Sequence, residues 1–289
     1  MWQFHGSATD LTPAEVAALL GNPDCHIEAR HIEASDGYQL RVYSFTPKQD
    51  NTSPPVVFIP GWTSVMDGWA PLLASWAEKR TIHYIETREK RSAIVPKKLR
   101  VNDFKMLRHA EDLSEVVSEL NLDSDVMWFG SSLGATVILH GMMEGHLRGN
   151  SAFLIAPNSQ FRFPTWMVPL MAAPWWCYSP LIRIGLPYLK WRLKEPGQYI
   201  RYKRTLTQAH LLRLKRSVQA NRRYDLPANL EKIDAKIAIC VAASDTLHTG
   251  TDSHGIVDAL PNGSLIEVPS NQYAHEADVI GDIDAWESV

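Results

Sequence analysis

The sequence has 289 residues, of which 45% are hydrophobic and 21% charged, with a formal net charge of −3. This composition is typical of a globular protein with one large core or two smaller ones. No stretch approaches the roughly eighteen apolar residues of a membrane span, and residues 1–20 contain no run that fits a signal peptide. The three cysteines are widely spaced and predict neither a disulfide framework nor a metal site, so we expect a protein of the reducing cytoplasm.

The N-terminal region predicts a short helix followed by a β-hairpin. Thr12 and Glu15 form a capping-box pattern and Pro13 occupies the first helical position, so a helix should begin at this point. Two segments of alternating apolar and polar residues, 27–34 and 38–46, flank an Asp-Gly pair. Such a pair is typical of a hairpin turn, because glycine accepts positive φ at low cost.

The rest of the chain alternates predicted strands with predicted helices. The strands are short apolar runs over 55–59, 81–85, 126–129, 151–155, 236–243 and 265–268. The helices lie between them, over 69–77, 103–120, 133–143 and 252–260. This alternation predicts an α/β protein in which helices cover both faces of a mostly parallel sheet.

One long segment interrupts the alternation. Residues 158–228 are rich in Trp, Pro, Leu and basic residues and contain no obvious buried strand. We interpret them as a helical cap over the carboxyl ends of the strands, where open α/β sheets bind ligands. The predicted domains are therefore a core formed by residues 1–157 and 229–289 and a cap, or lid, formed by residues 158–228.

The strongest local motif is Gly-Ser-Ser-Leu-Gly at 130–134, between a predicted strand and a predicted helix. Its central residue, Ser132, should occupy a sharp turn that exposes the hydroxyl, and the flanking glycines avoid collisions in so tight a bend. The start of the following helix offers free N–H groups and a positive dipole end to a developing oxyanion. The motif therefore indicates a nucleophilic serine. The alternative is an ordinary glycine-rich turn in which Ser131 caps the helix.

A serine nucleophile needs a base to take its proton and an acid to orient that base. His275 follows the last predicted strand and Asp245 follows the strand before it, so both should lie at the same edge of the sheet as Ser132. We predict His275 as the base and Asp245 as the acid. His248 is a competing base, although it would come from the same loop as the acid. Other acids lie within the next predicted helix or before the strand: Asp252, Asp258 and Asp225.

The tetrahedral intermediate of acyl transfer needs two hydrogen-bond donors for its oxygen. One should be the backbone N–H of Leu133, which follows the nucleophile. The other should be the backbone N–H of Trp62, in the Pro-Gly-Trp-Thr loop after the strand 55–59. The indole of Trp62 can at the same time form part of the core or of a pocket wall, because the donor belongs to the main chain.

With these motifs, the chain from Ile27 to Trp286 resembles the α/β-hydrolase family. The resemblance implies an eight-stranded sheet, a Ser132–His275–Asp245 triad and an oxyanion hole, with no metal or organic cofactor. Two segments depart from the pattern of many members. Pro60 stands where they have a histidine, and residues 86–92 lack the glycines of a motif that they carry after the next strand.

The predicted cap combines apolar and cationic side chains. Between Pro180 and Arg223 it holds twelve Lys and Arg residues and one acid, Glu195. Trp166 and Met167 precede this stretch and are, with Trp62, the candidate substrate-binding side chains. Such a mixture suits an acyl chain entering from an anionic membrane surface. The alternative is a cap whose Trp and Met pack on the body while Lys and Arg face water. No nucleic-acid recognition motif accompanies the charge.

The sequence thus predicts a carboxylic-ester hydrolase, esterase- or lipase-like, that cleaves medium acyl or aromatic esters of small molecules through an acyl-enzyme. The same residues would serve an acyltransferase, a thioesterase or an amidase. A non-catalytic binding protein on the same fold is the third hypothesis, motivated by the departures at Pro60 and Glu86.

Overall fold

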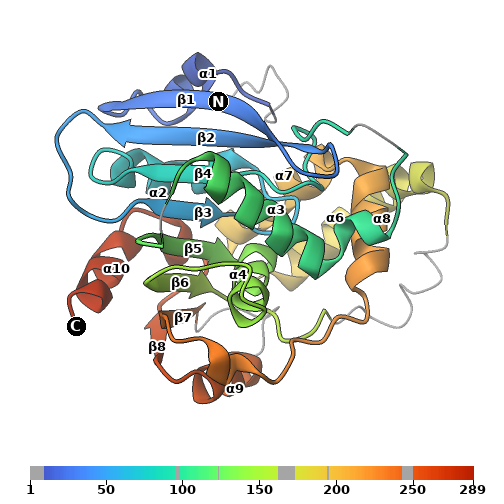
Figure 1. Ribbon diagram of the computed structural model, residues 1–289. Coiled ribbons are helices and arrows are strands. Elements are labelled where there is room, and N and C mark those ends of the chain that lie inside the picture. Colours follow the sequence, from blue (N-terminus) through green and yellow to red (C-terminus); the bar gives the residue numbers. More distant parts are fainter. Residues whose placement is uncertain (1–9, 96–97, 123, 162–172, 194, 243–249) are drawn as a thin grey trace.

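The computed structural model describes residues 10–95, 98–122, 124–161, 173–193, 195–242 and 250–289. Eight strands form one sheet in the order β1-β2-β4-β3-β5-β6-β7-β8 (Figure 1). They are β1 (Cys25–Glu33), β2 (Gln39–Pro47), β3 (Val56–Ile59), β4 (Ile82–Ile85), β5 (Met127–Ser131), β6 (Ser151–Ile155), β7 (Lys236–Ala242) and β8 (Gly263–Val268). The pairs β1–β2 and β2–β4 are antiparallel and all other neighbours are parallel. The predicted eight-stranded, mostly parallel sheet is confirmed.

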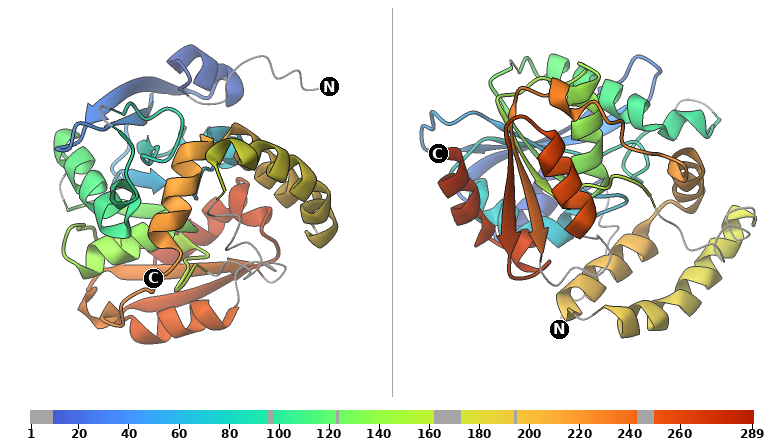
Figure 2. Two further views of the ribbon diagram at one scale, coloured as in Figure 1. Left: turned by 90° about the vertical axis from the view of Figure 1, so that its right-hand side faces the viewer. Right: turned by 90° about the horizontal axis from the view of Figure 1, so that it is seen from below.

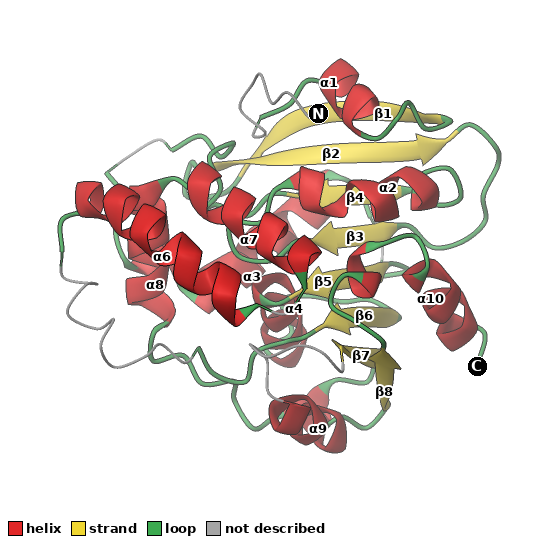
Figure 3. Ribbon diagram, turned by 180° about the vertical axis from the view of Figure 1, so that it is seen from behind, coloured by secondary structure: helices red, strands yellow, loops and turns green. Residues whose placement is uncertain are grey.

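Helices cover both faces of the sheet, and an apolar core lies between the sheet and the helices on each face. One face carries α3 (Met106–Glu119), α4 (Leu133–Met143) and α9 (Gly250–Ala259). The other face carries α1 (Pro13–Leu19), α2 (Ala70–Trp76) and α10 (Val279–Glu287), and it is turned toward the viewer in Figure 3. Short 3-10 turns are η1 (Met66–Trp69), η2 (Asn102–Phe104), η5 (Leu230–Lys232) and η6 (Tyr273–His275).

The local signals in the sequence predicted these elements well. The capping box of Thr12 and Glu15 is present at the start of α1. The four central strands β3, β4, β5 and β6 are buried almost throughout, as continuous apolar runs predict. One helix was not predicted: α10 buries Val279, Ile280, Ile283 and Trp286, a helical spacing that lies beyond the His275 loop.

The segment between β6 and β7 is helical where the structure describes it. It contains η4 (Trp175–Cys177), α6 (Tyr178–Arg192), α7 (Pro196–Gln208) and α8 (Leu211–Asn221). Its described part has no strand beyond an isolated bridge between Gln160 and Asp225. Figures 1 and 2 place these helices beside the carboxyl ends of the parallel strands. The boundaries of the cap at 158 and 228 stay a prediction.

A buried ionic network connects the loop after β4 to the helix α3. Arg88 is fully buried, and its Nε donates to Asp112 Oδ2 at 2.5 Å while its Nη1 donates to the backbone oxygen of Asp103 at 2.9 Å. Its guanidinium also lies over the ring of Tyr38, 4.3 Å from the centroid. Asp112 is itself only 1% exposed. Because a buried charge is costly unless it is paired, this cluster ties the loop after β4 firmly to α3.

His83 gives the fold a predicted sensitivity to acid. It lies in β4, its Nδ1 is 2.9 Å from Ser44 Oγ, and burial, with Arg30 nearby, lowers its pKa from 6.5 to about 4. Between these two pH values the unfolded chain binds a proton that the folded chain does not, so the free energy of unfolding should fall as the pH drops through this window. Between pH 6.5 and about 4 we expect the His83→Gln variant to lose less of its free energy of unfolding than the wild type. Urea unfolding above this pH range and within it measures the difference. Parallel profiles of variant and wild type would contradict this account.

No helix in the described part of the chain is long and apolar enough to cross a membrane.

Candidate active site

Ser132 occupies a strained turn between β5 and α4. Its backbone has φ 50° and ψ −111°, a conformation that residues other than glycine rarely adopt. Its N–H donates to the backbone oxygen of Ile155 at 2.8 Å, which ties the turn to the end of β6. Ser132, not Ser131, precedes the first residue of the helix, and its side chain makes no capping hydrogen bond. The strained turn therefore does not use the hydroxyl of Ser132 as a helix cap.

The two glycines of the motif are required by close contacts. A Cβ atom on Gly130 would lie 2.8 Å from the backbone nitrogen of Ala135. A Cβ on Gly134 would collide with the backbone oxygen of Ile59, at the end of β3. The helix can approach the sheet this closely only because both positions lack a side chain.

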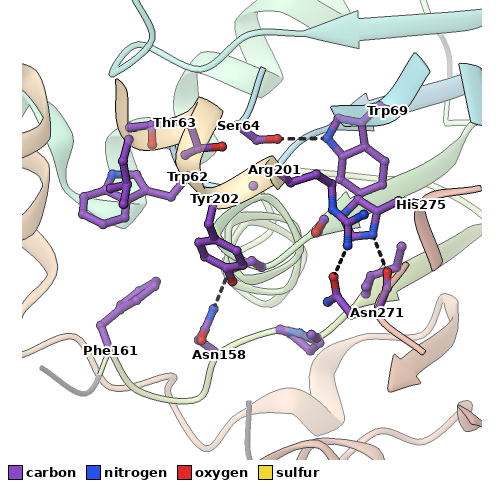
Figure 4. Close-up of a pocket in the computed structure, with 18 of the residues that line it drawn as sticks. Trp62, Thr63, Ser64, Trp69, Asn158, Phe161, Arg201, Tyr202, Asn271 and His275 are labelled. Atoms are coloured by element: carbon purple, nitrogen blue, oxygen red, sulfur yellow. Dashed lines mark hydrogen bonds between the residues drawn. The ribbon is translucent and has the colours of Figure 1, made fainter. Parts of the chain in front are cut away.

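A cavity of about 320 Å³ opens above Ser132. Its walls come from the loop after β3, the serine turn, the segment after β6, the helix α7 and the loop after β8 (Figure 4). Ser132 and His275 both line it, so the structure brings together two of the three residues predicted as a triad. The cavity is also lined by Trp62, Trp69, Asn158, Phe161, Arg201 and Asn271.

His275 is held by a ring stack and by its own loop. The ring stacks on Trp69 with centroids 4.0 Å apart and planes 23° apart, and Nδ1 lies 2.8 Å from the backbone oxygen of Asn271. A carbonyl oxygen can only accept a hydrogen bond, so Nδ1 carries the proton. Nε2 is then the basic nitrogen of the neutral ring, as a general base requires.

The loop after β3 lies beside Ser132, as predicted. Gly61 and Trp62 line the cavity, and Thr63 has a positive φ of 49°. The indole Nε1 of Trp62 donates to Ser217 Oγ on α8 at 3.0 Å, so this side chain forms a wall between core and cap. Leu133 is the first residue of α4. The roles of the Trp62 and Leu133 N–H groups as oxyanion donors stay predictions.

Several predicted site residues lie outside the part of the chain that the structure describes: Asp245, His248, Trp166 and Met167. Their roles as acid, alternative base and substrate contacts therefore stay predictions. Within the described ranges, no cluster of three or more His, Cys, Asp or Glu residues could hold a metal ion.

Sequence comparison finds no relative, since no family model and no curated protein matches the chain. Solved structures do match. An esterase from Thermogutta terrifontis is 14% identical with a TM-score of 0.71, over 90% of this chain and 98% of that one. A hydrolase from Pseudomonas aeruginosa PA01 is 18% identical with a TM-score of 0.69, over 90% and 96%. An alpha/beta hydrolase from Sphaerobacter thermophilus is 17% identical with a TM-score of 0.65, over 89% and 99%.

The chain has the α/β-hydrolase fold. This agrees with the resemblance inferred from the motifs. Such low identities establish the fold alone, so the chemistry has to be argued from the site.

Asn158 is a polar contact of Ser132 that was not predicted from the sequence. Its Nδ2 donates to Ser132 Oγ at 3.2 Å (Figure 4). Its own backbone N–H donates to the hydroxyl of Thr136 at 2.9 Å, which fixes the residue beside the serine turn. Its position just after β6, at the carboxyl edge of a parallel strand, was the available signal.

Residues 86–92, where the sequence departs from the family pattern, support the loop beside Ser132. The buried Lys90 ammonium donates to the backbone oxygens of Gly61 and Ser64, each at 2.9 Å. Glu89 Oε1 accepts the backbone N–H of Thr63 at 3.2 Å. Burial lowers the pKa of Lys90, and the neighbouring Glu89 carboxylate opposes that shift. In this chain an ion pair therefore holds the 61–64 loop.

The cap in turn holds the loop of His275. Glu195 accepts the backbone N–H of Asn271 at 3.1 Å through Oε1 and that of Gln272 at 2.9 Å through Oε2. Arg201 on α7 donates from Nη2 to Asn271 Oδ1 at 2.5 Å (Figure 4). Since Asn271 also accepts from the His275 ring, the cap positions the predicted base through one intervening residue.

Glu195→Ala should therefore disturb the site through the His275 loop and not through a contact with the substrate. Losing both backbone contacts lets the His275 loop move, and a misplacement of about 1 Å costs on the order of 100-fold in rate. We expect kcat for an ester to fall by about 10- to 100-fold, while KM changes little, in steady-state assays. Glu231→Ala, an exposed acid on η5, is the matched control. An unchanged kcat would show that the loop keeps its place without the cap.

Proposed function

We propose that the protein is a serine hydrolase that cleaves carboxylic esters through an acyl-enzyme intermediate. The observation that carries the proposal is the strained turn of Ser132 on the wall of a cavity that His275 also lines. A serine is held at positive φ at a strand-to-helix turn mainly where its hydroxyl must be presented to a ligand.

The proposed mechanism begins with attack of Ser132 Oγ on the ester carbonyl. Asn158 donates to this oxygen, which leaves the serine hydrogen available for His275 Nε2. His275 then gives the proton to the leaving alcohol as the C–O bond breaks. A water molecule, deprotonated by the same nitrogen, hydrolyses the acyl-enzyme and regenerates the serine. Asp245 is the proposed acid that stabilises the charged imidazole.

Charge on the carbonyl oxygen needs donors that are in place before the reaction. We propose the backbone N–H groups of Leu133 and Trp62. Lys90 donates hydrogen bonds to the 61–64 loop and Glu89 accepts one from it, and these bonds support the assignment because they fix the backbone around Trp62 without contacting the substrate.

The size and lining of the cavity favour a medium acyl or aromatic ester of a small molecule. About 320 Å³ lies at the lower end of the range for small-molecule sites. Trp62, Trp69 and Phe161 offer apolar walls, and Arg201 adds a cation at one side.

Labelling with a fluorophosphonate probe tests the proposal. We expect the folded wild type to form a stoichiometric adduct that peptide mass spectrometry locates on Ser132. Ser132→Ala should not react, whereas Ser131→Ala should still be labelled and heat-denatured protein should not. No adduct in the folded wild type would favour a non-catalytic binding protein. Equal labelling of Ser132→Ala would show that another residue reacts with the probe and would overturn the assignment of Ser132.

Hydrolysis of p-nitrophenyl esters from acetate to palmitate then measures the acyl preference. We expect the highest kcat/KM for medium chains and a fall at palmitate, which exceeds the cavity. Labelling without turnover of any ester, but with turnover of thioesters or amides or with transfer to an added alcohol, would move the assignment to one of those reactions.

A further inference from the structure

The helix α6 presents an apolar stripe to solvent. None of its 15 residues is buried. Ile184, Tyr188 and Trp191 are 74%, 51% and 82% exposed. Their spacing of four and three residues places them on the same face of the helix. Exposed side chains of this size are common singly, but a row of them marks an interaction surface.

The stripe continues into the turn that precedes the helix. Trp175 and Trp176 of η4 are 48% and 64% exposed. In the described part of the chain, six of the nine large hydrophobic residues that are exposed lie on the cap, including Ile200 of α7. Figure 2 shows α6 at the outer edge of the molecule, away from the sheet and its covering helices. Among the residues that the structure describes, none covers this face of α6.

Cations flank the stripe on both sides, and α6 has no acidic residue. Arg183 and Lys190 lie on one side of it at helical spacing, and Arg192 lies on the other. All three are exposed. Arg192 donates to the Tyr188 hydroxyl at 3.2 Å, which brings its guanidinium to the edge of the stripe. An apolar face bordered by long basic side chains is the pattern of a helix that lies in a membrane interface.

We propose that α6 and η4 dock on a phospholipid bilayer whose headgroups are anionic. The stripe of Trp175, Trp176, Ile184, Tyr188 and Trp191 would enter the boundary between headgroups and acyl chains. Arg183, Lys190 and Arg192 would extend to the phosphates while their stems cover apolar surface. The helix lies along the surface in this arrangement and does not cross it.

The charges beside the stripe favour an anionic bilayer over a second copy of the chain as the partner of this face. A symmetric dimer through this face would bring two sets of three cations together without an acid on either α6 to pair with them. An anionic bilayer pairs with all of them at once. The proposal does not depend on the chemistry of Ser132, because the stripe lies outside the cavity.

Cosedimentation with vesicles tests the proposal. We expect the wild type to bind vesicles of phosphatidylcholine with phosphatidylglycerol and to bind phosphatidylcholine alone much more weakly. Arg183→Gln with Lys190→Gln should weaken binding about 25-fold, since each cation near the surface contributes about 1 kcal/mol, a factor of about 5. Ile184→Ser with Trp191→Ser should weaken it on the order of 100-fold or more, because each removes a buried apolar side chain.

Matched controls remove the same chemistry elsewhere. Leu107→Ser, on α3, and Lys79→Gln, after α2, are exposed and should leave vesicle binding unchanged. Unaltered circular dichroism melts show that the α6 variants are folded. Equal binding of wild type and α6 variants, or no preference for anionic lipid, would overturn the proposal. So would a wild-type dimer, in sedimentation without lipid, that Ile184→Ser with Trp191→Ser converts to a monomer.

Discussion

Ser132→Ala is expected to lower kcat/KM for p-nitrophenyl esters by about 1,000-fold or more, the scale seen when a serine nucleophile is removed from a hydrolase. The variant keeps the backbone of the turn, because alanine needs no more room than serine. The free energy of unfolding should therefore stay within about 1 kcal/mol of the wild type. Loss of activity with an unchanged urea midpoint would assign the chemistry to the hydroxyl.

The control for this prediction is Ser118→Ala, an exposed serine on α3 that should leave the rate unchanged. Ester hydrolysis that survives in Ser132→Ala would show that another group carries the reaction. The non-catalytic hypothesis would then also need testing, by measuring whether small esters bind without turnover.

Arg88→Met is expected to cost about 3–5 kcal/mol of stability, because it leaves Asp112 buried with one strong partner fewer. The Tm should fall by on the order of 10 °C. Urea unfolding measures the free energy, and Arg30→Met, an exposed arginine on β1, is the control with little expected effect.

A second substitution separates charge from packing at this site. Arg88→Met with Asp112→Leu should recover part of the lost stability, since the unpaired carboxylate is removed as well. A loss below about 1 kcal/mol for Arg88→Met alone would mean that Arg108, which also binds Asp112, suffices to satisfy the carboxylate.

The order of strands and helices could be read from the sequence because periodicity and burial are local signals. Continuous apolar runs such as Val56–Ile59 are typical of strands that are buried on both faces of a mostly parallel sheet. The same logic placed Ser132 and His275 at one edge, since parallel strands end on the same side. The assignment of Asp245 followed from this rule and remains a prediction.

The supports of the site could not be read in this way, because they depend on contacts between distant parts of the chain. Lys90 reaches Gly61 across 29 positions, and Glu195 reaches Asn271 across 76. No local spacing encodes such a pairing. The sequence shows that residues 86–92 lack the glycines of the family motif. The structure shows that Glu89 and Lys90, in this segment, hold the 61–64 loop.

The hydrogen bonds of Lys90 bear on which substitutions the 61–64 loop can accept. One ammonium binds the carbonyl oxygens at both ends of the 61–64 loop, and both bonds are made to main chain. The course of this loop therefore depends little on which side chains it carries. Trp62 and Thr63 are thus positions at which natural variation or directed evolution could reshape the cavity while the backbone around Ser132 keeps its place.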